Sequence, residues 1–200
     1  MPSSRGVRVA QAEDTRTKLI RSARTLFARQ GFHATASAEI VAAAGVTRGA
    51  LQHHFARKED LFLAVFEAVE TDLMARAAAN AHNASGKDLW AAFRNSLGAF
   101  LEAATQPDVQ RILLIDGPAV LGWEQWRKLE ADHGMASIKA AVEAAFADGL
   151  IRPAPVEALA HLIMALIHES ALMVAHSKKP KKTRADAEQA LDALFSNMSK

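Results

Sequence analysis

Residues 35–55, TASAEIVAAAGVTRGALQHHF, contain two short helical patterns separated by a glycine. The first pattern turns Ile40 inward and ends at Gly45, because glycine readily adopts the positive φ found after a helix. The second begins after Thr47, a suitable N-cap, and turns Leu51 inward to pack on the rest of the domain. Two short helices joined by such a tight turn are typical of a helix-turn-helix, which lays its second helix in the major groove of duplex DNA.

The second helix of this motif begins with polar and small residues that suit base readout. Arg can bond the edge of guanine and Gln that of adenine, although either can instead hold a phosphate, which positions the protein without specifying a sequence. Lys58, at the start of the next helix, is expected to clamp a phosphate, and Thr35 to cap the first helix. The residues predicted to contact DNA are Thr35, Ser37, Thr47, Arg48, Gly49, Gln52, His53 and Lys58.

Charge is unevenly distributed along the chain, although the formal net charge is only +2. Residues 1–60 carry 10 Lys and Arg against 5 Asp and Glu, residues 61–177 carry 8 against 14, and residues 178–200 carry 6 against 3. A basic amino-terminal end on an acidic body is expected where that end meets phosphate. Charge alone does not separate this interpretation from a solvated helix surface.

Alanine is abundant, Tyr and Cys are absent, and apolar residues recur at helical spacing, which favours an all-α fold. A disordered arm is expected over residues 1–11, a three-helix DNA-binding domain over 12–65, and a larger helical bundle for ligand binding and dimerisation over 66–200. The first helix is expected over 13–30, and a chain break at the IDGP of 115–118. A basic loop is expected over 177–184. Later helices are predicted over 58–82, 88–104, 119–147, 156–176 and 185–198.

Residues 15–67 resemble the DNA-binding domain of TetR-type transcriptional regulators in one continuous register. Family members usually carry Ser or Thr where this chain has Ala36, Tyr where it has Gln52, and often Ser where it has Arg57. These departures remove one phosphate contact and suggest a different operator sequence. The matching features are Thr15-Arg16, Ala23, Leu26-Phe27, Gly31-Phe32, Thr35, Ile40, Ala43 to Val46, Gly49, Leu51, Phe55, Lys58-Glu59 and Leu61.

The resemblance implies a homodimeric repressor that binds a palindromic operator and is released by a small apolar effector. In the family the last two helices of each subunit pair into a four-helix interface, and the effector lies inside the carboxy-terminal half. The residues assigned to that interface are Leu162, Leu166, Glu169, Met173, Leu191, Leu194 and Phe195. Those assigned to the pocket, each of which could equally be plain core, are Phe93, Leu97, Phe100, Trp123, Trp126, Met135, Met164 and His168.

Other functions find little support in the sequence. His53 and His54 are adjacent on a helix and point about 100° apart, so no metal site is expected there. His161, His168 and Glu169 are more readily explained as interface or pocket groups than as ligands of a metal. No catalytic motif is present, so neither an enzyme nor a cofactor is predicted.

A cytoplasmic location is predicted, with no membrane partner. The start of the chain lacks the apolar core of a signal peptide, and charged and polar residues interrupt the longest apolar stretch. Two alternatives to an effector-released repressor stay open. One is a helical small-molecule-binding protein with a vestigial helix-turn-helix, and the other is a ligand-independent DNA-binding dimer.

Overall fold

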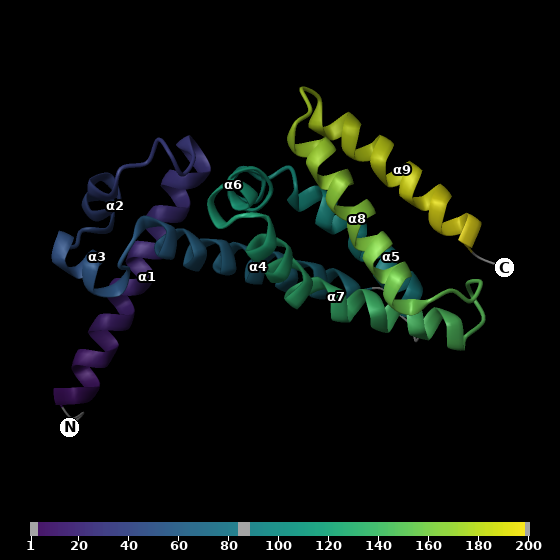
Figure 1. The fold of residues 1–200 in the computed structure, drawn as a ribbon, viewed down its shortest axis with the longest axis horizontal. Coiled ribbons are helices and arrows are strands. Elements are labelled where there is room, and N and C mark those ends of the chain that lie inside the picture. The colour runs from purple at the N-terminus through teal and green to yellow at the C-terminus, as the bar shows by residue number, and fades with distance from the viewer. Residues whose placement is uncertain (1–3, 84–88, 199–200) are drawn as a thin grey trace.

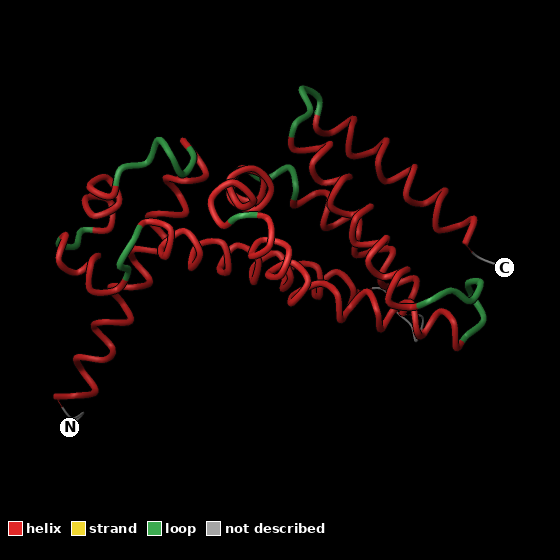
Figure 2. The backbone as a smooth tube through the Cα atoms, viewed as in Figure 1, coloured by secondary structure: helices red, strands yellow, loops and turns green. Residues whose placement is uncertain are grey.

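The computed structural model describes residues 4–83 and 89–198, and within these ranges helices are joined by short loops (Figures 1 and 2). An amino-terminal domain of three helices is followed by a larger helical bundle, so the predicted all-α fold is confirmed. The elements are α1 (Ser4–Gln30), α2 (Ser37–Ala44), α3 (Arg48–His54), α4 (Lys58–Asn83), α5 (Leu89–Ala103), the π-helix η1 (Val109–Asp116), α6 (Gly117–Leu121), α7 (Trp123–Ala147), α8 (Val156–Ala175) and α9 (Pro180–Met198).

The amino-terminal domain packs α1, α2 and α3 around the first turns of α4, at the left of Figure 1. Its centre is an aromatic cluster in which the ring of Phe27 lies 5.7 Å from that of Phe32 and 5.5 Å from that of Phe62. Ile40 of α2 and Leu51 of α3 are buried in the same core. Burial of each such side chain contributes about 1.5–3 kcal/mol, so apolar packing orients the two short helices.

The long helix α4 leaves this domain and enters the bundle, where α5, α7, α8 and α9 lie (Figure 1). Trp90 of α5 packs edge-on against Phe195 of α9, with ring centroids 5.6 Å apart. The centre of α8 is apolar because the helix packs against both α7 and α9. Among the described helices, α8 alone is long and apolar enough to cross a membrane. This is weak evidence for a membrane span, because the buried core helices of other proteins meet the same criterion.

Three predicted boundaries are wrong. The arm expected over residues 1–11 is helical from Ser4, since residues 4–12 contain no proline and a single Gly costs a helix only about 1 kcal/mol; residues 1–3 lie outside the described range. The basic loop expected over 177–184 is helical from Pro180, because proline suits the first position of a helix. The chain does not break at 115–118 but at Gly122, which has a φ of 78°.

Candidate DNA-binding surface and ligand cavity

The turn between α2 and α3 has the conformation that its sequence predicted. Gly45 adopts φ 64° and ψ 33°, and its N–H and that of Val46 donate to the carbonyls of Ala42 and Val41 at 3.2 Å. The Thr47 side chain then accepts a hydrogen bond from the Ala50 N–H at 3.1 Å and caps α3. These local bonds set the angle at which α3 leaves the turn.

The side chains of α3 divide between a buried face and an exposed face. Leu51 faces the core, whereas Arg48, Gly49, Gln52 and His53 are exposed. Arg48 makes no ion pair within the described part of the chain, so its guanidinium is available to an external acceptor. Ser37 is exposed in the first turn of α2. Thr47, Arg48, Gln52 and His53, the residues predicted to read bases, are therefore all accessible to solvent.

Thr35 does not belong to that surface. Its side chain is only 1% exposed, and its hydroxyl donates to the Gly31 carbonyl at 2.7 Å. The N-cap of α2 is instead Ala36, whose N–H donates to the Glu39 carboxylate at 2.8 Å. The prediction of Thr35 as a cap and a DNA contact was wrong, because the helix starts one residue later and the hydroxyl satisfies a buried carbonyl of the preceding loop.

Lys58 was predicted to clamp a phosphate, but its ammonium group is engaged inside the domain. The Nζ atom donates to the carbonyls of Phe32 and Thr35 at 2.9 and 3.0 Å and lies 4.1 Å from the centre of the Phe32 ring. It ties the start of α4 to the loop between α1 and α2. The sequence did not indicate this role, because its partners are backbone carbonyls 23 and 26 residues away.

The neighbouring Arg57 is exposed and pairs with Asp60, with 3.0 Å between Nη2 and Oδ1. Hydrogen bonds from the Arg57 side chain and N–H lower the pKa of Asp60, and the same pair raises the pKa of Arg57. Both side chains are accessible to solvent, so the pair contributes little to stability.

The bundle contains a cavity of about 520 Å³ between α4, α5, η1, α7 and α8. Five of the predicted pocket residues line it: Phe93, Leu97, Phe100, Met164 and His168. A larger part of the wall was not predicted, and most of its members come from α4, η1 and α7. They include Phe66, Glu70, Leu73, Met74, Val109, Leu113, Leu114, Gly134, Ser137 and Ile138. The spacing of Phe66, Glu70 and Leu73 on one helical face was a signal that could have found them.

Three predicted pocket residues do not line the cavity. Trp123 is 65% exposed and packs against Trp126 at 5.2 Å between ring centroids. Trp126 is buried and its Nε1 donates to the Leu113 carbonyl at 3.0 Å, so it braces the back of η1. Met135 is buried in the core of the bundle. Their helical spacing was right, but α7 turns these side chains away from the cavity.

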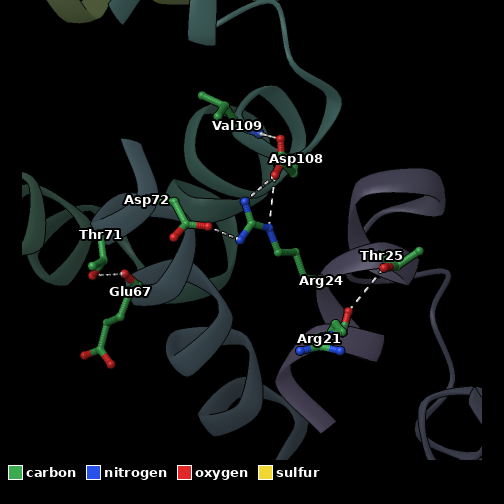
Figure 3. A network of polar contacts seen from close by, with 8 residues as sticks. All are labelled: Arg21, Arg24, Thr25, Glu67, Thr71, Asp72, Asp108 and Val109. Carbon is green, nitrogen blue, oxygen red and sulfur yellow. Dashed lines mark hydrogen bonds and ion pairs between the residues drawn. The ribbon is translucent and has the colours of Figure 1, made fainter. Parts of the chain in front are cut away.

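A polar network joins the amino-terminal domain to the wall of the cavity (Figure 3). Arg24 of α1 donates through Nε and Nη2 to Asp108 at 3.0 and 2.6 Å, and through Nη1 to Asp72 of α4. Partial burial lowers the pKa of Arg24, but the two carboxylates outweigh it and raise that pKa above its usual value. Because Asp108 caps η1, one guanidinium holds α1, α4 and η1 together.

A second link lies at the other end of η1. The buried Asp116 carboxylate accepts the Phe32 N–H at 2.7 Å and the Arg111 Nε at 3.2 Å. The Arg111 guanidinium lies against Gly31, where an added Cβ would come within 2.1 Å of it. The opposite side of η1 carries Leu113 into the cavity wall. The same short helix therefore contacts both the cavity and the loop that precedes α2.

Several apolar side chains on α8 and α9 are exposed. Leu162 is 64% exposed and Met173 49%, with Leu166 and Leu194 also accessible and Glu169 beside them on α8. Leu191 and Phe195, which were also predicted to form the dimer interface, are buried within the subunit. Their assignment was wrong, because the inner face of α9 packs on α5 and α8.

Comparison with known proteins identifies similar chains across both parts. The profile described as "Bacterial regulatory proteins, tetR family" matches residues 19–65, and that described as "Tetracyclin repressor-like, C-terminal domain" matches residues 90–198. The HTH-type transcriptional regulator AcrR of Shigella flexneri is 43% identical over 63 residues, which cover 32% of this chain and 29% of AcrR. The chain thus matches less than a third of the length of that curated relative.

Solved structures match over nearly the full length. A TetR-family transcriptional regulator from Pectobacterium atrosepticum is 32% identical, with a TM-score of 0.82 over 95% of this chain and 96% of that one. RolR, solved in complex with resorcinol, has a TM-score of 0.69 over 95% of each chain. At 18% identity, that second likeness concerns the fold alone.

Proposed function

This chain belongs to the TetR family of transcriptional regulators, and on that premise we propose that it is an effector-released repressor rather than an enzyme. It would bind a palindromic operator as a homodimer. The observation that carries this proposal is the exposed face of α3, where Arg48, Gln52 and His53 are free of the core that orients the helix. Such a helix places its amino-terminal residues against base edges in the major groove.

Selection from a random duplex library, followed by gel-shift titration of the selected sequence, tests operator binding. We expect Arg48→Ala and Gln52→Ala each to weaken specific binding by about 1–3 kcal/mol. The exposed Arg152, at the far end of the bundle, supplies the control Arg152→Ala, which removes the same charge without reducing binding. Unchanged affinity in both α3 variants would show that this helix does not read DNA.

The dimer would form through the exposed apolar residues of α8 and α9. Exposure of apolar side chains such as Leu162 and Met173 to water is unfavourable. An isologous contact with a second copy of the chain would bury them. Two recognition helices about 34 Å apart then match successive major grooves, which explains a palindromic site. We expect Leu162→Asp to sediment as a monomer, while Leu191→Asp should unfold the subunit instead.

Release by an effector requires a cavity and a connection from it to α3. The cavity of about 520 Å³ supplies the first, which favours this function over a ligand-independent dimer. The second is η1, whose N-cap Asp108 holds α1 and whose last residue, Asp116, holds the loop before α2. A ligand that displaces Leu113 in the cavity wall would shift these links and change the spacing of the recognition helices. The free energy that couples ligand binding to DNA release is set by the difference in the ligand's affinity for the two arrangements.

A further inference from the structure

Pro118 determines where the π-helix η1 has to end. In a π-helix each carbonyl pairs with the N–H five residues later, whereas in an α-helix the partner lies four residues later. The residue five positions after Leu113 is Pro118, which has no N–H, so the π pattern offers the Leu113 carbonyl no backbone donor. The π pattern therefore cannot continue past this carbonyl, and the α-helix α6 begins at Gly117.

Trp126 supplies the donor that Pro118 lacks. Its indole is 3% exposed, and Nε1 donates to the Leu113 carbonyl at 3.0 Å. In the α pattern the Gly117 N–H would serve Leu113, and the carbonyl without a backbone donor would be that of Leu114. A buried carbonyl without a donor is unfavourable in either pattern. Because the indole N–H reaches Leu113, it stabilises the π pattern.

The surroundings of Trp126 hold the indole in place. Its ring centroid lies 5.2 Å from that of Trp123 and 5.6 Å from that of His168. A Cβ added at Gly117 would lie 3.1 Å from Cδ1 of Trp126 and 2.9 Å from Cε2 of Phe66, so only glycine lets both rings close on the junction of η1 and α6. Phe66 and His168 also line the cavity. The donor is thus fixed by packing against residues of the cavity wall.

The π pattern also determines where the carboxylates at the two ends of η1 point. Asp108 bonds Arg24 of α1, and Asp116 accepts the Phe32 N–H at 2.7 Å. Each residue turns about 100° around the axis of an α-helix and about 80° in a π-helix, so between Asp108 and Asp116 the two patterns differ by roughly 150°. An α-helical η1 would therefore break at least one of these two links to the amino-terminal domain.

We propose that Trp126 is the positioning residue that keeps η1 in the π pattern, and that operator binding depends on its bond to the Leu113 carbonyl. This inference rests on the proposed function for its connection to the operator, and it adds the interaction that sets the conformation of η1. Loss of the bond releases α1 or the loop before α2, and the recognition helices lose their spacing. Leu113 lines the cavity, so a ligand that moves it acts on the same bond.

Removal of the indole N–H tests this proposal. Trp126→Phe keeps an aromatic ring without a donor, and incorporation of 3-benzothienylalanine at position 126 replaces the N–H by sulfur while retaining the shape of the indole. The second variant keeps the test decisive if the smaller ring of Trp126→Phe prevents folding. In a crystal structure of either variant we expect the Leu113 carbonyl to accept the Gly117 N–H, as in an α-helix.

Hydrogen exchange of the full chain supplies a second readout. In both variants we expect the Phe32 amide to exchange about tenfold faster relative to the amide of Ile163, which is buried in the centre of α8. A uniform loss of stability would instead accelerate both amides equally. Trp123→Phe is the matched control, because it removes the indole N–H of the exposed neighbour and should leave exchange at Phe32 as in the wild type.

Operator affinity is measured on the same preparations, and it should fall about tenfold in both variants of Trp126 but not in Trp123→Phe. Retention of the π pattern in both variants, exchange at Phe32 unchanged relative to Ile163, or unchanged operator affinity would each overturn the inference. Failure of the wild type to select any DNA sequence would refute the proposed function. The crystal structures and hydrogen exchange would still report whether Trp126 holds η1 in the π pattern.

Discussion

The link between Asp116 and Phe32 gives the most direct test of how the two parts of the chain are joined. Asp116 is 5% exposed and accepts the buried Phe32 N–H at 2.7 Å. Replacing it with Ala leaves that N–H without its partner, which costs about 1–3 kcal/mol. Arg111 also loses its partner, but its side chain is 42% exposed and can be hydrated, so this loss adds under about 1 kcal/mol.

We therefore expect Asp116→Ala to lower the free energy of unfolding by about 2 kcal/mol. Asp116→Asn keeps an acceptor for the Phe32 N–H and loses only the charge, so it should cost about 0.5–1 kcal/mol. The exposed Asp186, which pairs with Lys182 one turn earlier on α9, supplies the control Asp186→Ala, with an expected loss below about 0.5 kcal/mol.

Urea unfolding followed by the fluorescence of the tryptophans, of which Trp90 and Trp126 are buried, measures these differences, and hydrogen exchange reports the Phe32 amide directly. Faster exchange at Phe32 in Asp116→Ala, with slow exchange retained in Asp116→Asn, would locate the loss at the predicted bond. Equal destabilisation by the two substitutions, or a loss in Asp116→Ala no larger than in Asp186→Ala, would refute the reasoning. The hydrogen bond would then not hold η1 to the DNA-binding domain.

Three further predictions concern the amino-terminal domain. Gly45→Ala places a Cβ at φ 64° and should cost about 1–2 kcal/mol in a thermal or urea melt, with Gly45→Asn costing less; equal stability would mean that the turn relaxes. Lys58→Met should lower stability by about 1.5–3 kcal/mol and leave the salt dependence of DNA binding unchanged, because its ammonium group bonds two internal carbonyls; a reduced salt slope would restore the phosphate clamp. Arg57 lowers the pKa of Asp60, so the stabilisation from this pair is present above the usual Asp pKa and is lost as pH falls through the lowered value. NMR titration of Asp60 should show that pKa rising in Arg57→Ala, and an unchanged value would contradict the pairing.

The helix-turn-helix illustrates what short-range pattern can determine. Gly45 and Thr47 act through bonds to residues at most five positions away, so their roles were readable from the sequence. The burial of Leu51 predicts the exposure of His53, because residues two positions apart point to nearly opposite sides of a helix; Arg48 and Gln52 flank the buried side and are also exposed in the structure. Local geometry is enough for such features, since no distant segment decides them.

The roles of Lys58 and Thr35 depended on the approach of segments that are distant in sequence. A lysine after a recognition helix can reach phosphate or turn inward, and the choice depends on where the Phe32 carbonyl lies. Similarly, helical periodicity identified Trp123 and Trp126 as one apolar group. Only the tertiary position of Trp126, whose Nε1 donates to the Leu113 carbonyl of η1, decided that Trp126 is buried while Trp123 is exposed.

By itself, the sequence determined the all-α fold, the position of the recognition helix and its exposed residues, since each depends on spacing within one or two turns. Tertiary structure alone decided the cavity, because its wall joins five separate helices, and it alone turned Glu70 into that wall. It also decided which apolar residues of α9 stay inside the subunit. Side chains with the same helical spacing differ in burial because neighbouring helices cover one face and leave the other in water.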